Sequence, residues 1–175
     1  MKILISGSFC SGKTTLAKDL IERLPDVFML TEPVRDLAGI YTQELIARPE
    51  ARSYLLIRQL LIEAQADEKY QYLICDAGIE SNLAHDRLYG IEHESDIVEK
   101  FGHRRYDMVF YCEYKEIAIE NDGFRITDYA LREDLDSMIR SELNNLKYTY
   151  VTLTGPPQDR VDIALNCILK KSFRK

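Results

Sequence analysis

A glycine-rich stretch at residues 7–15, GSFCSGKTT, restricts the fold of this chain more than any other part of its sequence. It follows the short apolar run KILIS and leads into a segment of helical periodicity. The spacing Gly7-x-x-x-x-Gly12-Lys13-Thr14 is the P-loop pattern, in which glycines let the backbone curl so that successive N–H groups surround a phosphate. We therefore predict a strand, a phosphate-binding loop and a helix in that order, and not an ordinary Gly/Ser turn.

The residues of this loop predict a binding site for a nucleoside triphosphate with Mg²⁺. Lys13 supplies a charge for the β- and γ-phosphates, and the Thr14 hydroxyl can bind Mg²⁺. The helix that begins at Lys13 adds the positive end of its dipole. An arginine after the last strand, Arg160, is expected near the adenine or ribose, with a place on the helix surface as the alternative. The predicted nucleotide-binding residues are Gly7, Ser8, Cys10, Ser11, Gly12, Lys13, Thr14, Thr15 and Arg160.

Along the rest of the chain, short apolar runs alternate with longer segments of helical periodicity. Continuous apolar strands suit a parallel sheet that is covered on both faces. The predicted strands are 2–6, 27–31, 72–75, 108–112 and 150–153, and the predicted helices are 13–24, 53–69, 79–88, 129–146 and 160–170. Because no repeat or linker interrupts them, we predict one α/β domain over residues 1–175, with the P-loop NTPase fold and a five-stranded parallel sheet between two layers of helices.

The longest predicted helix, 53–69, has apolar residues at helical spacing. These residues predict the face that packs against the core, and the charged residues of the helix are expected on its other faces. The apolar set is Tyr54, Ile57, Leu60, Leu61 and Ala64, and the charged set is Arg58, Glu63 and Asp67.

Two carboxylates follow predicted strands, where ligands bind in open α/β sheets. Asp76 ends the third strand and is expected to hold Mg²⁺ together with Thr14, although a helix N-cap is an alternative. Glu32 precedes a proline that keeps its backbone from helical geometry, and it is the candidate base for an acceptor hydroxyl. A solvated loop glutamate is the alternative. Arg35 is expected to pair with Glu32 or to contact an anionic part of the acceptor, so the predicted substrate-binding residues are Glu32, Arg35 and Asp76.

Two arginines lie beyond the fourth predicted strand. Arg125 belongs to a polar turn at 120–128, and Arg132 lies at the start of the next helix. Phosphoryl transfer needs cationic donors that close over the γ-phosphate. We predict this role for both arginines, with surface arginines as the alternative, so that the predicted catalytic residues are Lys13, Glu32, Arg125 and Arg132.

Composition limits the partners of the chain. The net charge of -6 and the pI of about 5.2 argue against nucleic acid as a partner. No apolar run approaches the ~20 residues that a membrane span needs. The four cysteines form no CxxC pair, and with only three histidines zinc is not expected. Reduced thiols and the lack of a signal-peptide pattern favour the cytoplasm. The expected partners are a nucleoside triphosphate and a small-molecule acceptor, with a homodimer left open.

Taken in order, these elements resemble the P-loop nucleoside and nucleotide kinase group, and most closely the ribosylnicotinamide kinase domain of NadR-type proteins and related small ATPase/kinases. The resemblance rests on residues 7–15, 31–36, 75–78, 122–125 and 155–160. Glu32-Pro33 is also similar to deoxynucleoside kinases, in which a glutamate at this place activates the sugar 5′-hydroxyl. Two features depart from the pattern: Asp76-Ala77-Gly78 lacks an arginine of the deoxynucleoside kinases, and the chain has no tryptophan.

The resemblance implies an ATP-dependent phosphotransferase that passes the γ-phosphate to a hydroxyl of a nucleoside-like acceptor, of the ribosylnicotinamide or deoxynucleoside class. One alternative is a nucleoside monophosphate kinase, which would use Arg35, Arg48, Arg52 and Arg58 for the acceptor phosphate. The other is a regulatory module that binds or hydrolyses a nucleoside triphosphate without an acceptor.

Overall fold

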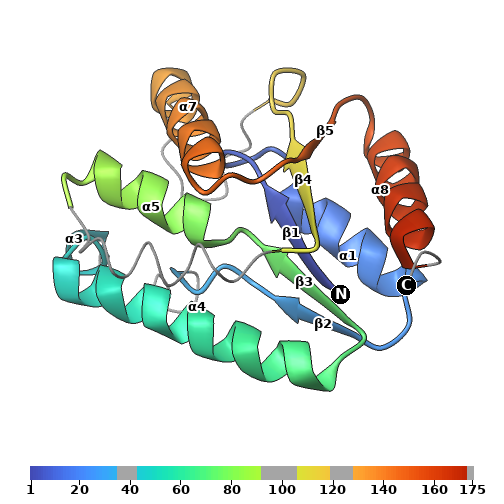
Figure 1. Ribbon diagram of the computed structural model, residues 1–175. Coiled ribbons are helices and arrows are strands. Elements are labelled where there is room, and N and C mark those ends of the chain that lie inside the picture. Colours follow the sequence, from blue (N-terminus) through green and yellow to red (C-terminus); the bar gives the residue numbers. More distant parts are fainter. Residues whose placement is uncertain (35–42, 92–105, 119–127, 173–175) are drawn as a thin grey trace.

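The computed structural model describes residues 1–34, 43–91, 106–118 and 128–172, which form a sheet between two layers of helices (Figure 1). Within these ranges, five parallel strands pair in the order β2-β3-β1-β4-β5. The strands are β1 (Lys2–Ser6), β2 (Val27–Leu30), β3 (Tyr72–Asp76), β4 (Met108–Cys112) and β5 (Val151–Leu153). The helices are α1 (Lys13–Arg23), α3 (Gln43–Ile46), α4 (Pro49–Lys69), α5 (Ile79–Leu88), α7 (Tyr129–Asn145) and α8 (Pro157–Ser172). The predicted fold is confirmed.

Two helices begin earlier than predicted, and both begin at a proline. Helix α4 starts at Pro49 and not at residue 53, and α8 starts at Pro157 and not at residue 160. Proline lacks an N–H and has a fixed φ, so the first turn of a helix tolerates it where the interior does not. The short helix α3 was not predicted.

Strand β1 lies at the centre of the sheet, and its neighbours determine what surrounds the glycine loop. Ile5 pairs with Asp76 of β3 on one side and with Phe110 of β4 on the other. Strand β2 pairs only with the outer side of β3 among the described strands. The loop after β1 is therefore flanked directly by the ends of β3 and β4, and β2 ends one strand further away.

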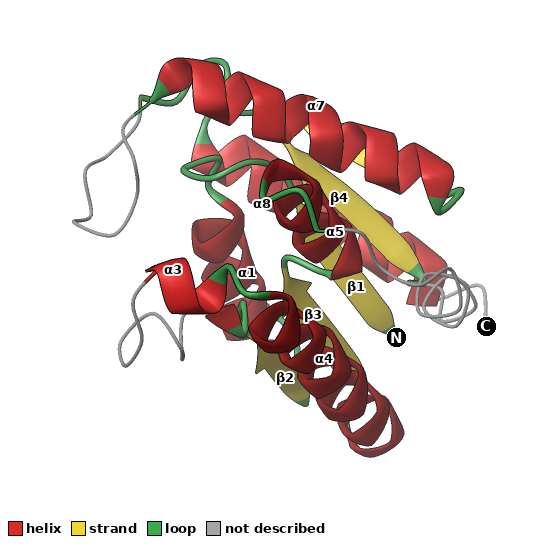
Figure 2. Ribbon diagram, turned by 90° about the vertical axis from the view of Figure 1, so that its left-hand side faces the viewer, coloured by secondary structure: helices red, strands yellow, loops and turns green. Residues whose placement is uncertain are grey.

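The strands divide their side chains between two apolar cores. Leu4 and Leu73 face the layer of α4, α5 and α7, whereas Ile3 and Ile74 face α1 and α8. Successive strand residues point to opposite faces, so a sheet covered on both faces needs continuous apolar strands. Figures 1 and 2 show α5 between α4 and α7 in the first of these layers.

The predicted core face of α4 is wrong for most of its residues, although Leu60 is partly buried against the core. Tyr54, Ile57 and Leu61 are 54%, 52% and 60% exposed, whereas Leu55 and Leu56 are buried. The buried face also includes four residues that are polar or small: Arg52, Gln59, Glu63 and Ala66. The buried polar residues find partners on other elements, which the periodicity of α4 alone does not reveal.

The partners on α5 and β1 explain this orientation. The Arg52 guanidinium forms an ion pair with Asp86 of α5, and Glu63 forms one with Lys2 of β1. Buried charges need such partners because an unpaired charge is costly to remove from water. These ion pairs leave the more apolar stripe of α4 exposed.

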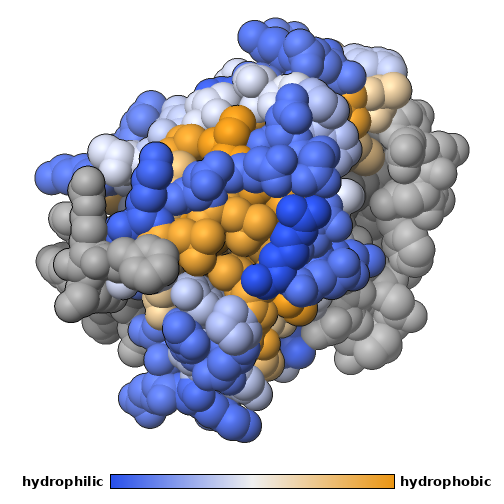
Figure 3. All heavy atoms as spheres, turned by 90° about the vertical axis from the view of Figure 1, so that its right-hand side faces the viewer, coloured by the Kyte–Doolittle hydropathy of each residue, from blue (hydrophilic) through white to orange (hydrophobic). Residues whose placement is uncertain are grey.

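Part of the surface on the side of α1 and α8 is apolar (Figure 3). Figure 3 views the side on which α1 and α8 lie, and it shows apolar surface among charged side chains. Ile163 and Leu169 of α8 are exposed.

Across the described ranges, no helix combines the length and the apolar character that crossing a membrane requires. Each of the four cysteines is a free thiol.

Two leucines of α4 test its corrected orientation. Leu56→Ala should lower the free energy of unfolding by about 2–5 kcal/mol, because it leaves a cavity in the core. Leu61→Ala, the matched control on the exposed face, should change it by no more than about 0.5 kcal/mol. Urea unfolding measures both. Equal losses, or a larger loss for Leu61→Ala, would contradict the orientation described here.

Candidate active site

The glycine loop has the backbone conformation that the motif predicts. Gly7, Cys10 and Gly12 have φ values of 137°, 54° and 87°. A Cβ on Gly7 would lie 2.7 Å from the carbonyl oxygen of Cys112 and 2.8 Å from Ser11 Oγ, so only glycine fits there. Such turns direct successive N–H groups to one side and form a concave site for an anion.

The donors of the loop lie close together. Lys13 Nζ donates hydrogen bonds to the carbonyl oxygens of Gly7 (2.8 Å) and Ser8 (2.7 Å). Ser8 and Ser11 are buried, and their hydroxyls have no hydrogen-bond partner among the described residues. Unpartnered buried hydroxyls beside a cationic side chain fit an anionic ligand such as a phosphate.

Asp76 lies beside the loop because β3 pairs with β1. Its carboxylate is buried, and its Oδ2 accepts a hydrogen bond of 2.5 Å from Thr14 Oγ1. The alternative role of helix N-cap is wrong, since the N-cap of α5 is Gly78 and no side chain caps that end. A hydroxyl and a carboxylate supply the hard oxygen ligands that Mg²⁺ prefers, so Thr14 and Asp76 fit this ion.

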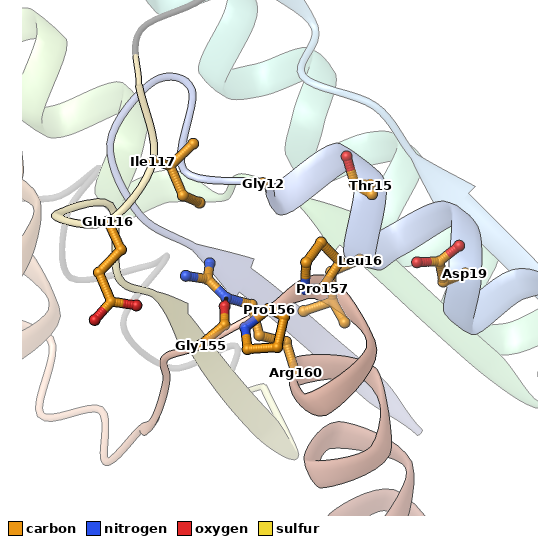
Figure 4. Close-up of a pocket in the computed structure, with 10 residues that line it drawn as sticks. All are labelled: Gly12, Thr15, Leu16, Asp19, Glu116, Ile117, Gly155, Pro156, Pro157 and Arg160. Carbon is orange, nitrogen blue, oxygen red and sulfur yellow. Dashed lines mark hydrogen bonds between the residues drawn. The ribbon is translucent and has the colours of Figure 1, made fainter.

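A cavity of about 370 Å³ lies next to the loop. Figure 4 shows its lining residues coming from the start of α1 and the residue before it, from the segment after β4, and from the turn before α8 with the first turn of that helix. Its lining residues are Gly12, Thr15, Leu16, Asp19, Glu116, Ile117, Gly155, Pro156, Pro157 and Arg160. Apolar walls with a few polar groups are typical of sites for small ligands, and a nucleobase suits this volume.

Arg160 lines this cavity, and three of its five N–H donors are already used. Its guanidinium donates to the carbonyl oxygens of Gly155 (2.8 Å), Ser11 (2.9 Å) and Glu113 (2.8 Å). The side chain is buried and not part of the helix surface. Its contact with an adenine or a ribose stays a prediction.

Arg132 lies behind the loop and is not a surface arginine. It is 1% exposed and donates to the carbonyl oxygens of Ile117 (2.8 Å), Cys10 (3.0 Å) and Tyr114 (3.2 Å). In this arrangement the guanidinium contacts the backbone of the loop. Its direct contact with a γ-phosphate stays a prediction. The other predicted arginines, Arg35 and Arg125, lie outside the described residues.

On the acceptor side, the structure adds a residue that the sequence did not single out. His85 of α5 lies near Glu32, whose negative charge acts on its ring. Burial lowers the pKa of His85 and outweighs this charge, so the ring is neutral at pH 7. Nδ1 lies 2.7 Å from the carbonyl oxygen of Ser81 and must donate to it, which leaves Nε2 as a hydrogen-bond acceptor. The sequence signal was only a histidine nine residues after Asp76.

Two of the arginines proposed for an acceptor phosphate, Arg48 and Arg52, have different surroundings. Arg52 is buried between α4 and α5, where it pairs with Asp86 and donates to Asn82. Arg48 is exposed at the N-cap of α4. A buried and paired Arg52 is not available to a phosphate, which weakens the nucleoside monophosphate kinase alternative.

A second carboxylate, that of Glu80, is buried against the turn that follows Asp76. Glu80 of α5 is fully buried, and its Oε1 accepts from the Gly78 N–H at 3.3 Å. A Cβ on Gly78 would lie 2.6 Å from Glu80 Oε2 and 2.7 Å from the Tyr106 hydroxyl, so this turn also needs glycine. Burial raises the pKa of Glu80 to about 7, although the hydrogen bond from the Gly78 N–H opposes the change.

Comparisons with known proteins agree with this fold. A family model described as "AAA domain" matches residues 2–160. A search of curated proteins gives no match.

Among solved structures, deoxyadenosine kinase from M. mycoides with bound dATP is 15% identical, with a TM-score of 0.67 over 96% of this chain and 98% of that chain. Thymidylate kinase from Candida albicans is 18% identical, with a TM-score of 0.69 over 98% and 91%. The NadR protein in complex with NAD and AMP-PNP is 14% identical, with a TM-score of 0.74 over 97% of this chain and 48% of that chain. The predicted resemblance to the P-loop nucleoside and nucleotide kinases is thereby confirmed for the fold.

Glu80 makes stability depend on pH in a direction that can be tested. The pKa rises from 4.5 to about 7 on folding, so the native state holds a proton that the unfolded state has already lost. The contribution of Glu80 to the free energy of unfolding is complete below pH 4.5. It declines as the pH rises to about 7, by roughly 3 kcal/mol in total.

Glu80→Gln should remove this decline, so the variant should gain stability relative to the wild type as the pH rises from 4.5 to 7. Urea unfolding across pH 4–8 measures the difference, with Glu22→Gln at an exposed position as the control. A constant difference across this range would contradict the role of Glu80.

Proposed function

The chain belongs to the AAA domain family, and on this premise we propose that it is a P-loop kinase that transfers the γ-phosphate of ATP to a hydroxyl of a nucleoside-like acceptor. The observation that carries the proposal is the group formed by Lys13, Thr14 and Asp76 at the carboxyl end of β1, next to a cavity that fits a nucleobase. Kinases among the structurally similar proteins support it.

The donor nucleotide would place its phosphates in the loop and its base in the neighbouring cavity. Lys13 would exchange its hydrogen bonds to the Gly7 and Ser8 carbonyls for bonds to phosphate oxygens, since an ammonium group pairs more strongly with an anion. The loop N–H groups and the dipole of α1 would stabilise the same charge. Thr14 and Asp76 would hold Mg²⁺, which would neutralise the charge that develops during transfer.

The acceptor would bind beyond β2 and β3, where Glu32 and His85 share one region. Glu32 would accept the proton of the attacking hydroxyl, which makes that oxygen a better nucleophile. The neutral His85 would orient the acceptor through Nε2. A nucleoside suits this region better than a nucleoside monophosphate, because Arg52 is already paired with Asp86. A module that hydrolyses ATP without an acceptor is the second candidate, since the loop and the cavity serve it equally well.

An acceptor screen tests the proposed function. ADP release from Mg²⁺-ATP should rise when the correct acceptor is added from a panel of nucleosides, nucleoside monophosphates and nicotinamide riboside. Monophosphates as the only active group would favour the nucleoside monophosphate kinase. ADP release that no acceptor changes would contradict the kinase proposal and favour the hydrolysing module.

Lys13→Ala tests the loop as the donor site. Loss of the ammonium group should lower turnover by at least about 10²-fold, because a preorganised donor is lost where charge develops. Lys18→Ala, an exposed position on the same helix, is the matched control and should keep wild-type turnover. Wild-type turnover by Lys13→Ala would contradict the assignment of the loop.

Glu32→Gln tests the acceptor side. The amide cannot accept a proton, so acceptor-dependent turnover should fall by roughly 10²–10⁴-fold, while ATP binding stays unchanged. Glu50→Gln, at an exposed position in the first turn of α4, is the control. Unchanged turnover of Glu32→Gln would show that another group takes the proton or that none is needed.

A further inference from the structure

Two buried arginines hold consecutive peptide groups of the glycine loop. Arg132 of α7 donates from Nη2 to the carbonyl oxygen of Cys10 at 3.0 Å. Arg160 of α8 donates from Nη1 to the carbonyl oxygen of Ser11 at 2.9 Å. The exposed fractions of the two arginines are 1% and 4%, and the contact of Arg160 with Ser11 is fully buried, whereas that of Arg132 with Cys10 is partly buried.

These contacts also orient the N–H groups of the loop. A trans peptide group is planar, and its C=O and N–H point in opposite directions. A guanidinium that holds the Cys10 carbonyl therefore fixes the direction of the Ser11 N–H, and one that holds the Ser11 carbonyl fixes that of the Gly12 N–H. The next carbonyl, of Gly12, accepts the first helical hydrogen bond of α1, from Leu16 N at 3.0 Å. Three successive peptide groups are thus held from behind.

The same arginines hold one wall of the neighbouring cavity. Arg160 donates to the carbonyl of Glu113, and Arg132 donates to the carbonyls of Tyr114 and Ile117. The Arg132 guanidinium also lies over the Tyr114 ring, 4.5 Å from its centre. The segment 113–117 is therefore joined to the loop through two charged side chains. Glu116 and Ile117, at the end of this segment, line the cavity.

We propose that Arg132 and Arg160 are positioning residues that present the Ser11 and Gly12 N–H groups to the phosphates of the bound nucleotide. In this role they act through the loop backbone, and the role requires no contact between either arginine and the phosphates. The inference rests on the proposed function only in that a nucleoside triphosphate binds in the loop, and it requires no acceptor. Preorganised donors lower the cost of binding, because the loop is not reordered when the anion enters.

Arg140 supplies a matched control on α7. It is also partly buried, and its guanidinium lies 3.9 Å from the centre of the Tyr111 ring. Its side-chain hydrogen bonds go to the carboxylates of Asp136 (3.0 Å) and Glu113 (2.9 Å), and not to the loop. Loss of this arginine should therefore reduce stability without disturbing the peptide groups of residues 10–12.

The experiment measures the affinity of Arg132→Met, Arg160→Met and Arg140→Met for ATP and for inorganic tripolyphosphate, by calorimetry without acceptor. It is run at a temperature at which circular dichroism shows every variant folded. Loss of either loop contact should weaken both ligands by roughly tenfold to a hundredfold, the effect of leaving a buried acceptor unpaired. Arg140→Met should stay within about twofold of the wild type. Arg132→Lys and Arg160→Lys, which keep the charge but lose the planar, forked set of donors, should give intermediate losses and replace the methionine variants if those do not fold.

Each outcome decides the inference. Wild-type affinity in the Arg132 and Arg160 variants would overturn it, and so would equal losses in all three positions, since these would reflect a general loss of structure. Failure of the wild type to bind either ligand would overturn both this inference and the proposed function. Wild-type binding of ATP without acceptor-dependent ADP release would contradict the kinase proposal alone, and the variants would still decide the role of the two arginines.

Discussion

The parallel pairing of β1 with β3 on one side and β4 on the other is the constraint on which the site depends. It brings Asp76 to Thr14 of the loop, because residues that end neighbouring parallel strands meet at the same edge. It also places the Cys112 carbonyl against Gly7, where no side chain fits. A sheet in another order would have kept the same motif and lost both contacts.

Positive charge gathers at the loop although the chain as a whole is acidic. Lys13, Arg132 and Arg160 all donate to backbone carbonyls around residues 7–11, and two of the three are buried. Elsewhere in the described ranges, buried cations such as Arg52 pair with carboxylates. The difference matters for function, because a cation that pairs with a carbonyl keeps its net charge and still attracts an anion.

The limits of prediction from sequence are clearest at α4 and α7. Helical periodicity in 53–69 predicted the wrong face of α4, because the ion pairs of Arg52 and Glu63 outweigh the burial of a more apolar stripe. Arg132 was correctly placed at the start of a helix, yet its partners are carbonyls more than ten residues away. Local patterns contain no information about partners that only folding brings near, and for the same reason His85 was not singled out.

The sequence by itself determined the strands, the loop and the order of the elements, because apolar runs, glycine spacing and helical periodicity act over neighbouring residues. It also predicted a phosphate site at Gly7, Lys13 and Thr14, since that motif is continuous in the chain. Only the tertiary structure decided which strands flank β1, which face of α4 is buried and that two arginines hold the loop from behind. Those outcomes depend on contacts between distant residues, whose energies are set by burial and pairing and not by local pattern.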